Sequence, residues 1–320
     1  MFAATLLIAL AIDAAVGDPD WLWRRYAHPV VWAGRLIARL DESLNQETAS
    51  AGARRAAGVL AVTLLVAAAG LTGYSLSALF DFAPLGWLAE ASAAAVLLAQ
   101  RSLYEHVARV GEAFAGGGLP EARLAVSMIV GRDPNALDEA GVCRAAVETL
   151  AENFSDGVVA PAFWFLVGGL PGLCIYKAVN TADSMIGNRS PRHEAFGWAA
   201  ARLDDALNLA PARLSGAFVA LAALLTGKDA RRAALAMRRD AWRHRSPNAG
   251  WPEAAMAGAL GLALAGPRVY ATGPVDDAYM NDGGRREATP QDIARALRLY
   301  VAACGVLWAV VALIAAIALS

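Results

Sequence analysis

The sequence predicts an all-α, polytopic integral membrane protein, and three observations support this. Hydrophobic residues make up 57% of the 320 residues and charged residues only 18%, whereas soluble domains carry about 25% charged residues. Long uncharged runs occur, and one extends from Leu299 to Leu319. Apolar residues recur at three- and four-residue spacings and no stretch alternates strictly, which is the helical pattern.

Composition also excludes several classes of protein. The net charge of −1 provides no basic field for nucleic acid, and the chain is too apolar to be disordered. The three cysteines, Cys143, Cys174 and Cys304, lie far apart without a Cys-x-x-Cys pair, which excludes a disulfide framework or a zinc site defined by spacing. Glycine-rich phosphate loops and the common hydrolase and metalloprotease motifs are absent.

Four segments are candidates for membrane-spanning helices, which need about 20 mostly apolar residues. They are residues 1–17, 56–80, 84–100 and 297–319. A cleaved signal peptide is the alternative for 1–17, but this segment has no positive start and carries Asp13, so we favour a retained helix. In all, we expect about four or five full spans.

Three other apolar segments, 157–176, 212–226 and 254–267, are short or interrupted. The first is broken by Gly168-Gly169-Leu170-Pro171-Gly172. Irregular backbone at membrane depth needs protein or a water-filled cavity around it. Such segments are therefore either half-helices that line a site, or ordinary kinked spans or buried amphipathic helices.

The distribution of Lys and Arg predicts the orientation in the membrane. Residues 18–55 carry six arginines, whereas the link at Asp81-Phe82-Ala83 carries none. Four basic residues between 177 and 202 favour a re-entrant 157–176. We therefore expect one membrane-embedded domain, 1–320, in the cell (inner) membrane. Its cytoplasmic polar segments are about 18–55, 101–156, 177–211, 228–253 and 268–296.

The densest polar cluster precedes the interrupted segment. Arg144, Glu148, Glu152 and Asp156 are spaced four residues apart, so they share one helical face, with Asn153 beside them. Such carboxylates suit Mg²⁺. The alternative is a solvated acidic face with an Arg144–Glu148 ion pair, which contributes little to stability.

Polar residues also follow the interrupted segment, where ionisable groups near the membrane are functional candidates. The first group is Lys177, Asn180, Asp183 and Ser184, in which Lys177 could simply snorkel. The second group is Arg202, Asp204, Asp205 and Asn208. It is either a cation or phosphate site or a set of surface salt bridges.

Two further groups have simple structural explanations. Ser246, Asn248 and Glu253 lie in a Pro- and Gly-containing loop. A helix entry explains most of this loop. It does not explain Glu253 at the start of a nearly uncharged segment, although a helix N-terminus favours a carboxylate. His28 follows Trp21, Trp23 and Tyr26 and is either an interface anchor or a ligand.

The order of the motifs resembles a known family. They are Val16-Gly17-Asp18-Pro19, His28-Pro29-Val30, Arg101-Ser102-Leu103, Ile129-Val130-Gly131-Arg132-Asp133, Glu148-Thr149-Leu150-Ala151-Glu152-Asn153-Phe154-Ser155-Asp156-Gly157, Tyr176-Lys177-Ala178-Val179-Asn180-Thr181-Ala182-Asp183-Ser184, Arg202-Leu203-Asp204-Asp205 and Ser246-Pro247-Asn248-Ala249-Gly250-Trp251-Pro252-Glu253. Together they resemble the membrane-bound adenosylcobinamide-phosphate synthase family of cobalamin biosynthesis, over residues from about 12 to 285. This chain departs at Pro134, where Thr is expected, and at residues 188–193.

The resemblance implies an amide-forming ligase. Such an enzyme joins adenosylcobyric acid to (R)-1-amino-2-propanol phosphate, or to the free aminopropanol, with ATP and Mg²⁺ and a cytoplasm-facing active site. The residues expected to do metal and base work are Glu148, Glu152, Asp156, Asp183, Asp204 and Asp205, with Glu152, Asp183 and Asp205 as metal ligands. The residues expected to contact phosphates are Arg132, Lys177 and Arg202. The remaining substrate contacts are expected from Asn153, Asn180, Asn248, Ser184, Asn208, Ser246, Glu253 and His28.

The alternative is a corrinoid-handling or transport component that makes no bonds, since broken helices are also a transporter feature. Transporters usually show repeated halves, and no internal repeat occurs here. In either case we expect the lipid bilayer as a partner, with other membrane enzymes of cobalamin assembly as further partners, and no nucleic acid.

Overall fold

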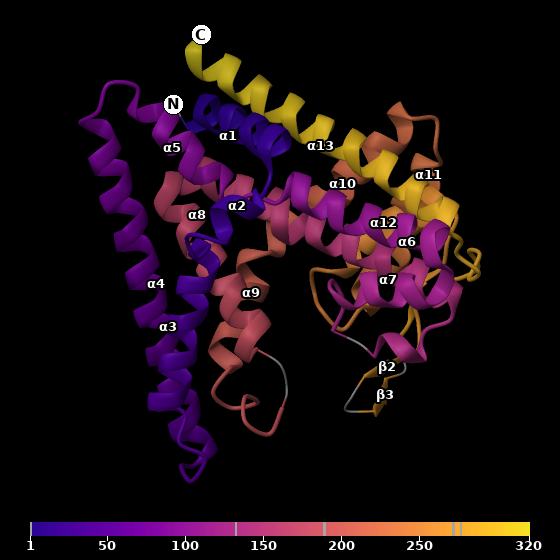
Figure 1. Cartoon of the computed structure of the whole chain (residues 1–320), viewed down its shortest axis with the longest axis horizontal. Coiled ribbons are helices and arrows are strands. Elements are labelled where there is room, and N and C mark those ends of the chain that lie inside the picture. Colours follow the sequence, from indigo (N-terminus) through magenta and orange to yellow (C-terminus); the bar gives the residue numbers. More distant parts are fainter. Residues whose placement is uncertain (1, 132, 188–189, 271–272, 276) are drawn as a thin grey trace. The chain divides into compact units, whose positions relative to one another are not determined.

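The structure is a computed structural model that describes residues 2–131, 133–187, 190–270, 273–275 and 277–320. It is almost entirely helical, as predicted (Figure 1). Its elements are α1 Phe2–Val16, α2 Asp20–Trp23, α3 Pro29–Leu44, α4 Ala51–Asp81, α5 Gly86–Ala95, α6 Gln100–Ser127, η1 Pro134–Ala136, α7 Glu139–Phe154, η2 Ser155–Val159, α8 Ala160–Ile186, α9 Trp198–Leu207, α10 Leu209–Leu225, α11 Ala230–Asp240, η3 Ala241–Arg243, α12 Gly250–Leu260, β1 Leu264–Ala265, β2 Arg268–Tyr270, β3 Gly273–Val275, β4 Tyr279–Met280 and α13 Pro290–Leu319.

Among the described residues, three helical segments are long and apolar enough to cross a bilayer: Ala51–Asp81, Glu139–Ile186 and Pro290–Ala318. The pair α9 and α10 makes a fourth if it is counted as one broken span. The predicted spans at 56–80 and 297–319 are thus confirmed as helices of spanning length.

The predicted span at 84–100 is wrong as a single helix. The helix there, α5, has 10 residues, which at 1.5 Å per residue covers only half of a hydrocarbon core about 30 Å thick. Leu85, at its start, has a φ of +63°, so no helix continues through it. The first helix, α1, is also short, with 15 residues, and it packs against α5.

Contacts divide the chain into two compact units, and each is described by itself. Unit 1 comprises residues 1–99, 160–208 and 311–320, and unit 2 comprises residues 100–159 and 209–310. The prediction of a single membrane-embedded domain stays a prediction.

In unit 1, α3 runs alongside α4, and both pack against α8 (Figure 1). One core cluster joins these helices to α9. Its members are Ile37, Ala61, Val62, Leu65, Ala178, Ala182, Ile186, Phe196 and Ala200. The alanines in this cluster allow the helices to approach closely, so close packing of small residues, rather than of large side chains, holds these helices together.

Helix α8 consists of two arms rather than one rod. Gly168 and Gly169 leave helical geometry, and Gly169 has a φ of +59°, a value that glycine adopts without steric cost. A Cβ atom at Gly172 would collide with the carbonyl oxygen of Trp164. In a straight helix, residues eight apart are separated by about 12 Å along the axis, so the chain must fold back here.

Two side-chain contacts show the same reversal. The Trp164 Nε1–H donates to the carbonyl oxygen of Leu207 at 3.1 Å, and the Tyr176 hydroxyl donates to Asn208 Oδ1 at 3.0 Å. Trp164 and Tyr176 thus reach adjacent residues of another segment, although they stand twelve positions apart in α8. The break predicted from the glycines and Pro171 is therefore a true reversal of the chain.

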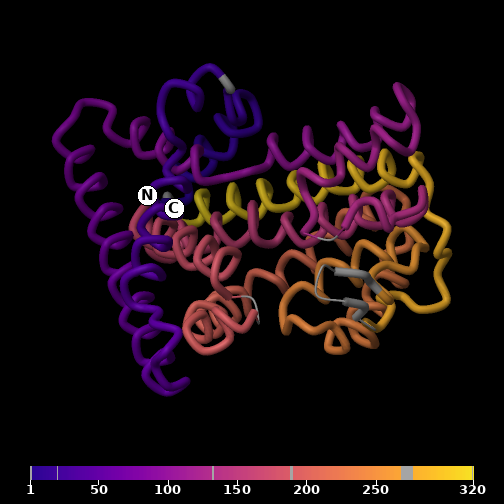
Figure 2. Tube along the Cα trace, turned by 60° about the horizontal axis from the view of Figure 1, so that its bottom comes forward, coloured from indigo at the N-terminus to yellow at the C-terminus, as the bar shows by residue number. Residues whose placement is uncertain are grey.

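In unit 2, α6 and the first part of α13 run side by side in opposite directions (Figure 2). The Tyr300 hydroxyl donates to the carbonyl oxygen of Gln100 at 2.8 Å, while Gly111 lies against Ile293. Helix α12 packs against α10, α11 and α7. Ten of its eleven residues are buried, all except Trp251. The strands form two short antiparallel pairs, β1 with β4 and β2 with β3.

Candidate functional site

Three carboxylates gather where α8 meets α9 in unit 1. Asp204 is the buried member, and its two oxygens accept from different helices. Asn180 Nδ2 on α8 donates to Asp204 Oδ1 at 3.3 Å, and Asn208 Nδ2 donates to Asp204 Oδ2 at 3.0 Å. Asn180 of the first predicted group and Asp204 and Asn208 of the second therefore form one contact network. We call Asp183, Asp204 and Asp205 the acidic cluster.

The other two carboxylates are near enough to Asp204 and to each other to interact electrostatically. Asp205 also accepts from Arg202 Nη1 at 3.0 Å, so the predicted surface ion pair does form. It is half-exposed on the arginine side, with 54% of the Arg202 side chain accessible, and such pairs contribute little to stability. The remaining repulsion within the cluster favours binding of a cation or an ammonium group.

The backbone at Gly187 packs closely against the side chain of Asp183. A Cβ atom at Gly187 would overlap the Asp183 carboxylate, so only glycine leaves this side chain its position. Ser184, by contrast, is exposed and its hydroxyl donates to the carbonyl oxygen of Asn180 at 3.0 Å. Of these two predicted residues, Asp183 faces the cluster and Ser184 bonds its own helix.

Tyr176 is a site residue that the sequence analysis did not select. Its ring is fully buried, at 0% exposure, and its hydroxyl orients the Asn208 amide described above. The only signal for it in the sequence is its place in the quoted motif, directly before Lys177.

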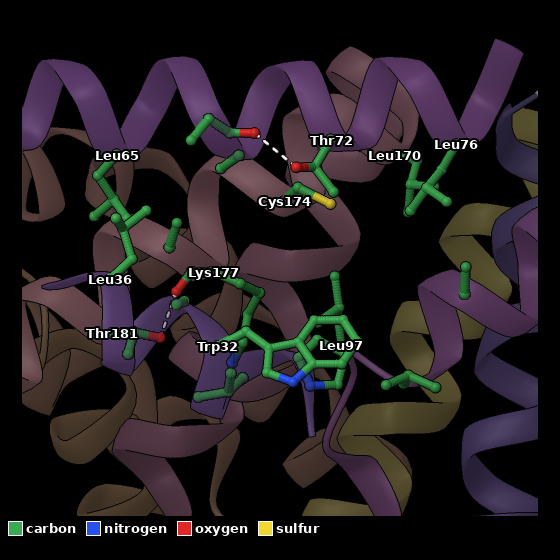
Figure 3. Close-up of a pocket in the computed structure, with 18 of the residues that line it drawn as sticks. Trp32, Leu36, Leu65, Thr72, Leu76, Leu97, Leu170, Cys174, Lys177 and Thr181 are labelled. Atoms are coloured by element: carbon green, nitrogen blue, oxygen red, sulfur yellow. Dashed lines mark hydrogen bonds between the residues drawn. The ribbon is translucent and has the colours of Figure 1, made fainter. Parts of the chain in front are cut away.

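An apolar pocket of about 390 Å³ lies in the same unit, between α3, α4 and α8 (Figure 3). Its walls include Trp23, Trp32, Leu97 and Leu170, and Lys177 is the one charged residue among those that line it. Ligand pockets are typically about 300–1,000 Å³, mostly apolar, with a few polar groups that fix orientation. Lys177 thus lines a pocket of ligand size. A lysine that only snorkels would instead extend its ammonium group to the membrane surface.

His28 lies beside this pocket in a structural role. It caps α3, with Nδ1 accepting from the Val30 amide at 3.2 Å, and its Nε2 lies 3.0 Å from the carbonyl oxygen of Val96. These two bonds require the neutral tautomer with the proton on Nε2. Burial lowers the pKa of His28 despite the opposing effect of Asp18, which agrees with a neutral ring.

In unit 2, Glu148 is buried at 3% exposure and does not face solvent. Its Oε1 accepts from the backbone amide of Ala265 at 2.8 Å, a residue whose φ is +58°. Arg144 donates to the carbonyl oxygen of Arg286 at 2.5 Å. Glu148 therefore ties α7 to β1, and a solvated acidic face is excluded at this position.

The predicted acidic helical face is interrupted after Glu152. Glu152 and Asn153 are exposed near the end of α7, and Asn153 donates to the carbonyl oxygen of Thr149 at 3.0 Å. Asp156 lies in η2, which is a π-helical turn. Single π turns inside helices are frequent at functional sites.

Ser155, in the same π turn, is the second residue that sequence reasoning missed. It is 1% exposed. Within the part of the chain that the structure describes, its Oγ has no hydrogen-bond partner. A buried hydroxyl without a partner costs free energy, which makes Ser155 a candidate for a ligand contact.

The loop before α12 is organised around His244. The Ser246 amide donates to His244 Nδ1 at 3.0 Å, and His244 Nε2 lies 3.6 Å from Glu253 Oε1. Ser246 Oγ accepts from the amides of Asn248 and Ala249, both at 3.2 Å. Ser246 thus serves the helix entry, and the buried Glu253, at 1% exposure, has a histidine neighbour that sequence spacing did not identify.

Arg213 is a further neighbour of this loop. Its Nη1 lies 3.4 Å from Asn248 Oδ1, and its guanidinium stacks over Trp251 at 4.7 Å. Arg132, the remaining predicted phosphate contact, lies outside the described residues. Among the described residues, no group of three or more His, Cys, Asp or Glu is arranged to hold a metal ion. The magnesium set Glu152, Asp183 and Asp205 draws on both units and stays a prediction.

The comparisons with known proteins agree with these motifs. The family model described as "CobD/Cbib protein" matches residues 6–300. A "Cobalamin biosynthesis protein CobD" of Rhizobium meliloti (strain 1021) is 53% identical over 305 residues, covering 94% of this chain and 93% of its own length. Proteins of the same description from Rhodobacter capsulatus and Brucella suis are 50% and 49% identical, over 98% and 92% of this chain and 98% and 91% of their own lengths. No solved structure matches.

Proposed function

Because the chain belongs to the CobD/CbiB family of cobalamin biosynthesis proteins, we propose that it is the amide-forming ligase of that pathway. It would join the free propionate of adenosylcobyric acid to (R)-1-amino-2-propanol phosphate and give adenosylcobinamide phosphate. The active site would face the cytoplasm, where ATP is available. The observation that carries this proposal is the acidic cluster beside Arg202 in unit 1.

The reaction needs an activated acyl group, since a carboxylate resists attack by an amine. Transfer of the γ-phosphoryl group of ATP to a propionate oxygen forms an acyl phosphate and releases ADP. The amine nitrogen then attacks the carbonyl carbon, the C–O bond to phosphate breaks, and the C–N bond forms. The ammonium form of the amine must first lose a proton, so the site needs a base.

The acidic cluster suits the amine side of this reaction. Its carboxylates attract an ammonium group, and Asp183 is a candidate to accept the proton. Asp204 is already held by Asn180 and Asn208, so we assign it to positioning rather than to proton transfer.

Mg²⁺ binds through one or two carboxylates together with substrate phosphates. Asp183 and Asp205 would supply such carboxylates, and the ion would supply charge neutralisation at the transferring phosphoryl group. The part predicted for Glu152, which lies in unit 2, stays a prediction. Lys177 and Arg202 would contact phosphate oxygens, and Asn180 would bond the corrin amides. The roles predicted for Asn153 and Asn248, which lie in unit 2, and for Arg132, which lies outside the described residues, stay predictions.

The pocket beside Lys177 supports an amphiphilic substrate. Its apolar walls would receive an apolar part of the corrinoid, while Lys177 would attract an anionic group at its edge. The cavity is too small for a whole corrinoid, so most of the substrate would lie outside it.

The alternative, a corrinoid-handling or transport component without catalysis, is favoured by one observation, the reversal of α8 at Gly168-Gly169. One assay separates the two functions. The purified full-length protein is given Mg-ATP with the corrinoid, the amine, or both, and ADP and product are measured. A ligase consumes ATP only when both substrates are present, and a component without catalysis gives no product in any combination.

The same assay tests the site. We expect Asp183→Asn to insert normally and to lose product formation. Glu42→Gln, an exposed carboxylate of the same unit on α3, removes a similar charge and should keep wild-type activity. Wild-type turnover by Asp183→Asn would refute the assignment of Asp183. Parallel assays with free and phosphorylated aminopropanol decide which amine is the substrate.

A further inference from the structure

Helix α11 presents an outward stripe that the proposed reaction does not use. Arg231, Leu235, Arg238 and Trp242 are spaced four, three and four residues apart and all are exposed, with Trp242 just beyond the helix in η3. This spacing places them on one face. Opposite them, Ala233, Ala236 and Asp240 are buried, and α12 packs there. We call the four exposed residues the α11 stripe.

The two arginines of the stripe carry uncompensated charge. Arg232 lies 3.7 Å from Asp229, and Arg239 and Arg243 lie 2.7 Å and 3.7 Å from Asp240. Within the described part of the chain, neither Arg231 nor Arg238 has an acidic partner. The segment 228–245 as a whole has seven Lys and Arg against two Asp, so its outward face is strongly positive.

Between these charges lie two large apolar side chains. Trp242 is 74% exposed and Leu235 is 52% exposed. Large apolar side chains are not expected on a face that only contacts water. Helices that lie in a membrane interface, by contrast, combine Lys and Arg with Trp and Leu. Trp also prefers the headgroup level of a bilayer.

The position of α11 in unit 2 agrees with a location at the headgroup level of the bilayer. Lys228, just before the helix, is close enough to Arg295 and Arg298 for their charges to lower its pKa, in addition to the larger effect of its burial. Arg295 and Arg298 are the last charged residues of α13 before the uncharged run Leu299–Leu319. The start of α11 therefore lies near the point where α13 enters the apolar part of the membrane.

We propose that the α11 stripe binds the headgroups of anionic phospholipids on the leaflet that faces it. Arg231 and Arg238 contact lipid phosphates, and Leu235 and Trp242 insert below them, between the headgroups and the acyl chains. Each basic side chain near an anionic leaflet strengthens such binding about five-fold. This inference does not rest on the ligase activity, because it uses none of the residues assigned to that reaction.

The test uses the full-length protein in nanodiscs, with Leu235→Cys carrying an environment-sensitive fluorophore. The lipids are phosphatidylcholine alone or phosphatidylcholine with phosphatidylglycerol, and a nitroxide lipid at headgroup depth acts as quencher. The parent chain, which keeps Cys143, Cys174 and Cys304, is treated identically and sets the background signal.

We expect phosphatidylglycerol to increase quenching and to shift the emission to the blue. Arg231→Gln and Arg238→Gln should each weaken the phosphatidylglycerol-dependent change about five-fold, and salt should weaken it too. Arg109→Gln is the matched control, since Arg109 is an exposed arginine of the same unit that lies 3.9 Å from Glu105. It should leave the change intact.

Two results would overturn the proposal. The first is quenching that is equal with and without phosphatidylglycerol and unaffected by the two arginine substitutions. The second is a label that stays unquenched in both lipids, which would assign the stripe to an acidic protein surface instead. Ligase activity measured in the same nanodiscs is a separate readout, so its loss would not be confused with loss of lipid binding.

Discussion

Asp204 and Asn208 stand one helical turn apart and are joined by two hydrogen bonds. The Asn208 amide donates to Asp204 Oδ2 at 3.0 Å and lies 3.2 Å from the Asp204 carbonyl oxygen. On its other side the same amide accepts from the Tyr176 hydroxyl. A single buried side chain, 1% exposed, thus connects Tyr176, on the second arm of α8, with the acidic cluster.

The first prediction removes that connection. Asn208→Ala leaves the Tyr176 hydroxyl and one Asp204 oxygen buried without this partner, so the free energy of unfolding should fall by about 1–3 kcal/mol. The measurement is thermal unfolding of the purified protein in detergent. Asn153→Ala, whose exposed amide bonds only its own helix, should change stability by less than about 0.5 kcal/mol. Equal losses in the two variants would contradict the network.

A second prediction concerns the packing of the α8 turn on α4. A Cβ atom at Gly73 would come within 2.6 Å of Pro171 Cα and 2.9 Å of the Leu170 carbonyl oxygen. Gly73→Ala should therefore cost about 1–3 kcal/mol, because backbone cannot yield as a side chain can. Gly70→Ala meets only the tip of Ile175, at 3.2 Å, and should be neutral or stabilising, since alanine favours helix. A stable Gly73→Ala protein would argue against this packing.

The third prediction is a pH dependence in unit 1. Burial alone would raise the pKa of Asp41, but hydrogen bonds from Asn45, Arg192 and His193 outweigh it and hold the pKa below its ordinary value of 3.8. The folded state therefore binds this proton more weakly than the unfolded state. The stabilising contribution is complete above the ordinary value and is lost as pH falls through the lower folded pKa.

Asp41→Asn should accordingly lower stability at neutral pH and lose less stability on acidification below about pH 4. Unfolding temperatures of both proteins from pH 7 to pH 3 give the comparison. Glu42→Gln, on the exposed side of the same helix, should show the same fall in unfolding temperature at acidic pH as the wild type. Parallel curves for wild type and Asp41→Asn would mean that Asp41 does not provide this stabilisation.

The fourth prediction tests the orientation in the membrane. Glu194→Cys lies at an exposed position between α8 and α9, and we expect it to be cytoplasmic and therefore protected from an impermeant thiol reagent added outside intact cells. Phe82→Cys, at a position 88% exposed in the link after α4, should be labelled, because that link carries no Lys or Arg. Labelling of the Glu194→Cys variant from outside would place the segment 187–197 on the other side.

The features that could be predicted from sequence depend on local pattern. The uninterrupted apolar run at 56–80 gave the correct helix α4, and the glycines at 168 and 169 marked the correct point of reversal. The run at 84–100 has similar composition, yet its helix ends at Ala95. Composition alone does not show where a helix ends.

Many side-chain contacts join residues far apart in the chain. Asp41 meets Arg192 across 151 positions, and Glu148 meets Ala265 across 117. Such partners are chosen by tertiary packing, which no spacing rule describes. Adjacent residues within a motif, such as Asp204 and Asp205, were therefore predictable as a group, whereas Tyr176, Ser155 and His244 were not.

The reversal of α8 also determines how the chain can be inserted during synthesis. The turn at Gly168-Gly169 joins the two arms of α8, so they reach their packed position as one hairpin. Their turn docks against Gly73 on α4, a helix that leaves the ribosome earlier. The receiving surface is thus already in place when the hairpin emerges, and this part of unit 1 can assemble co-translationally, before α9 is made.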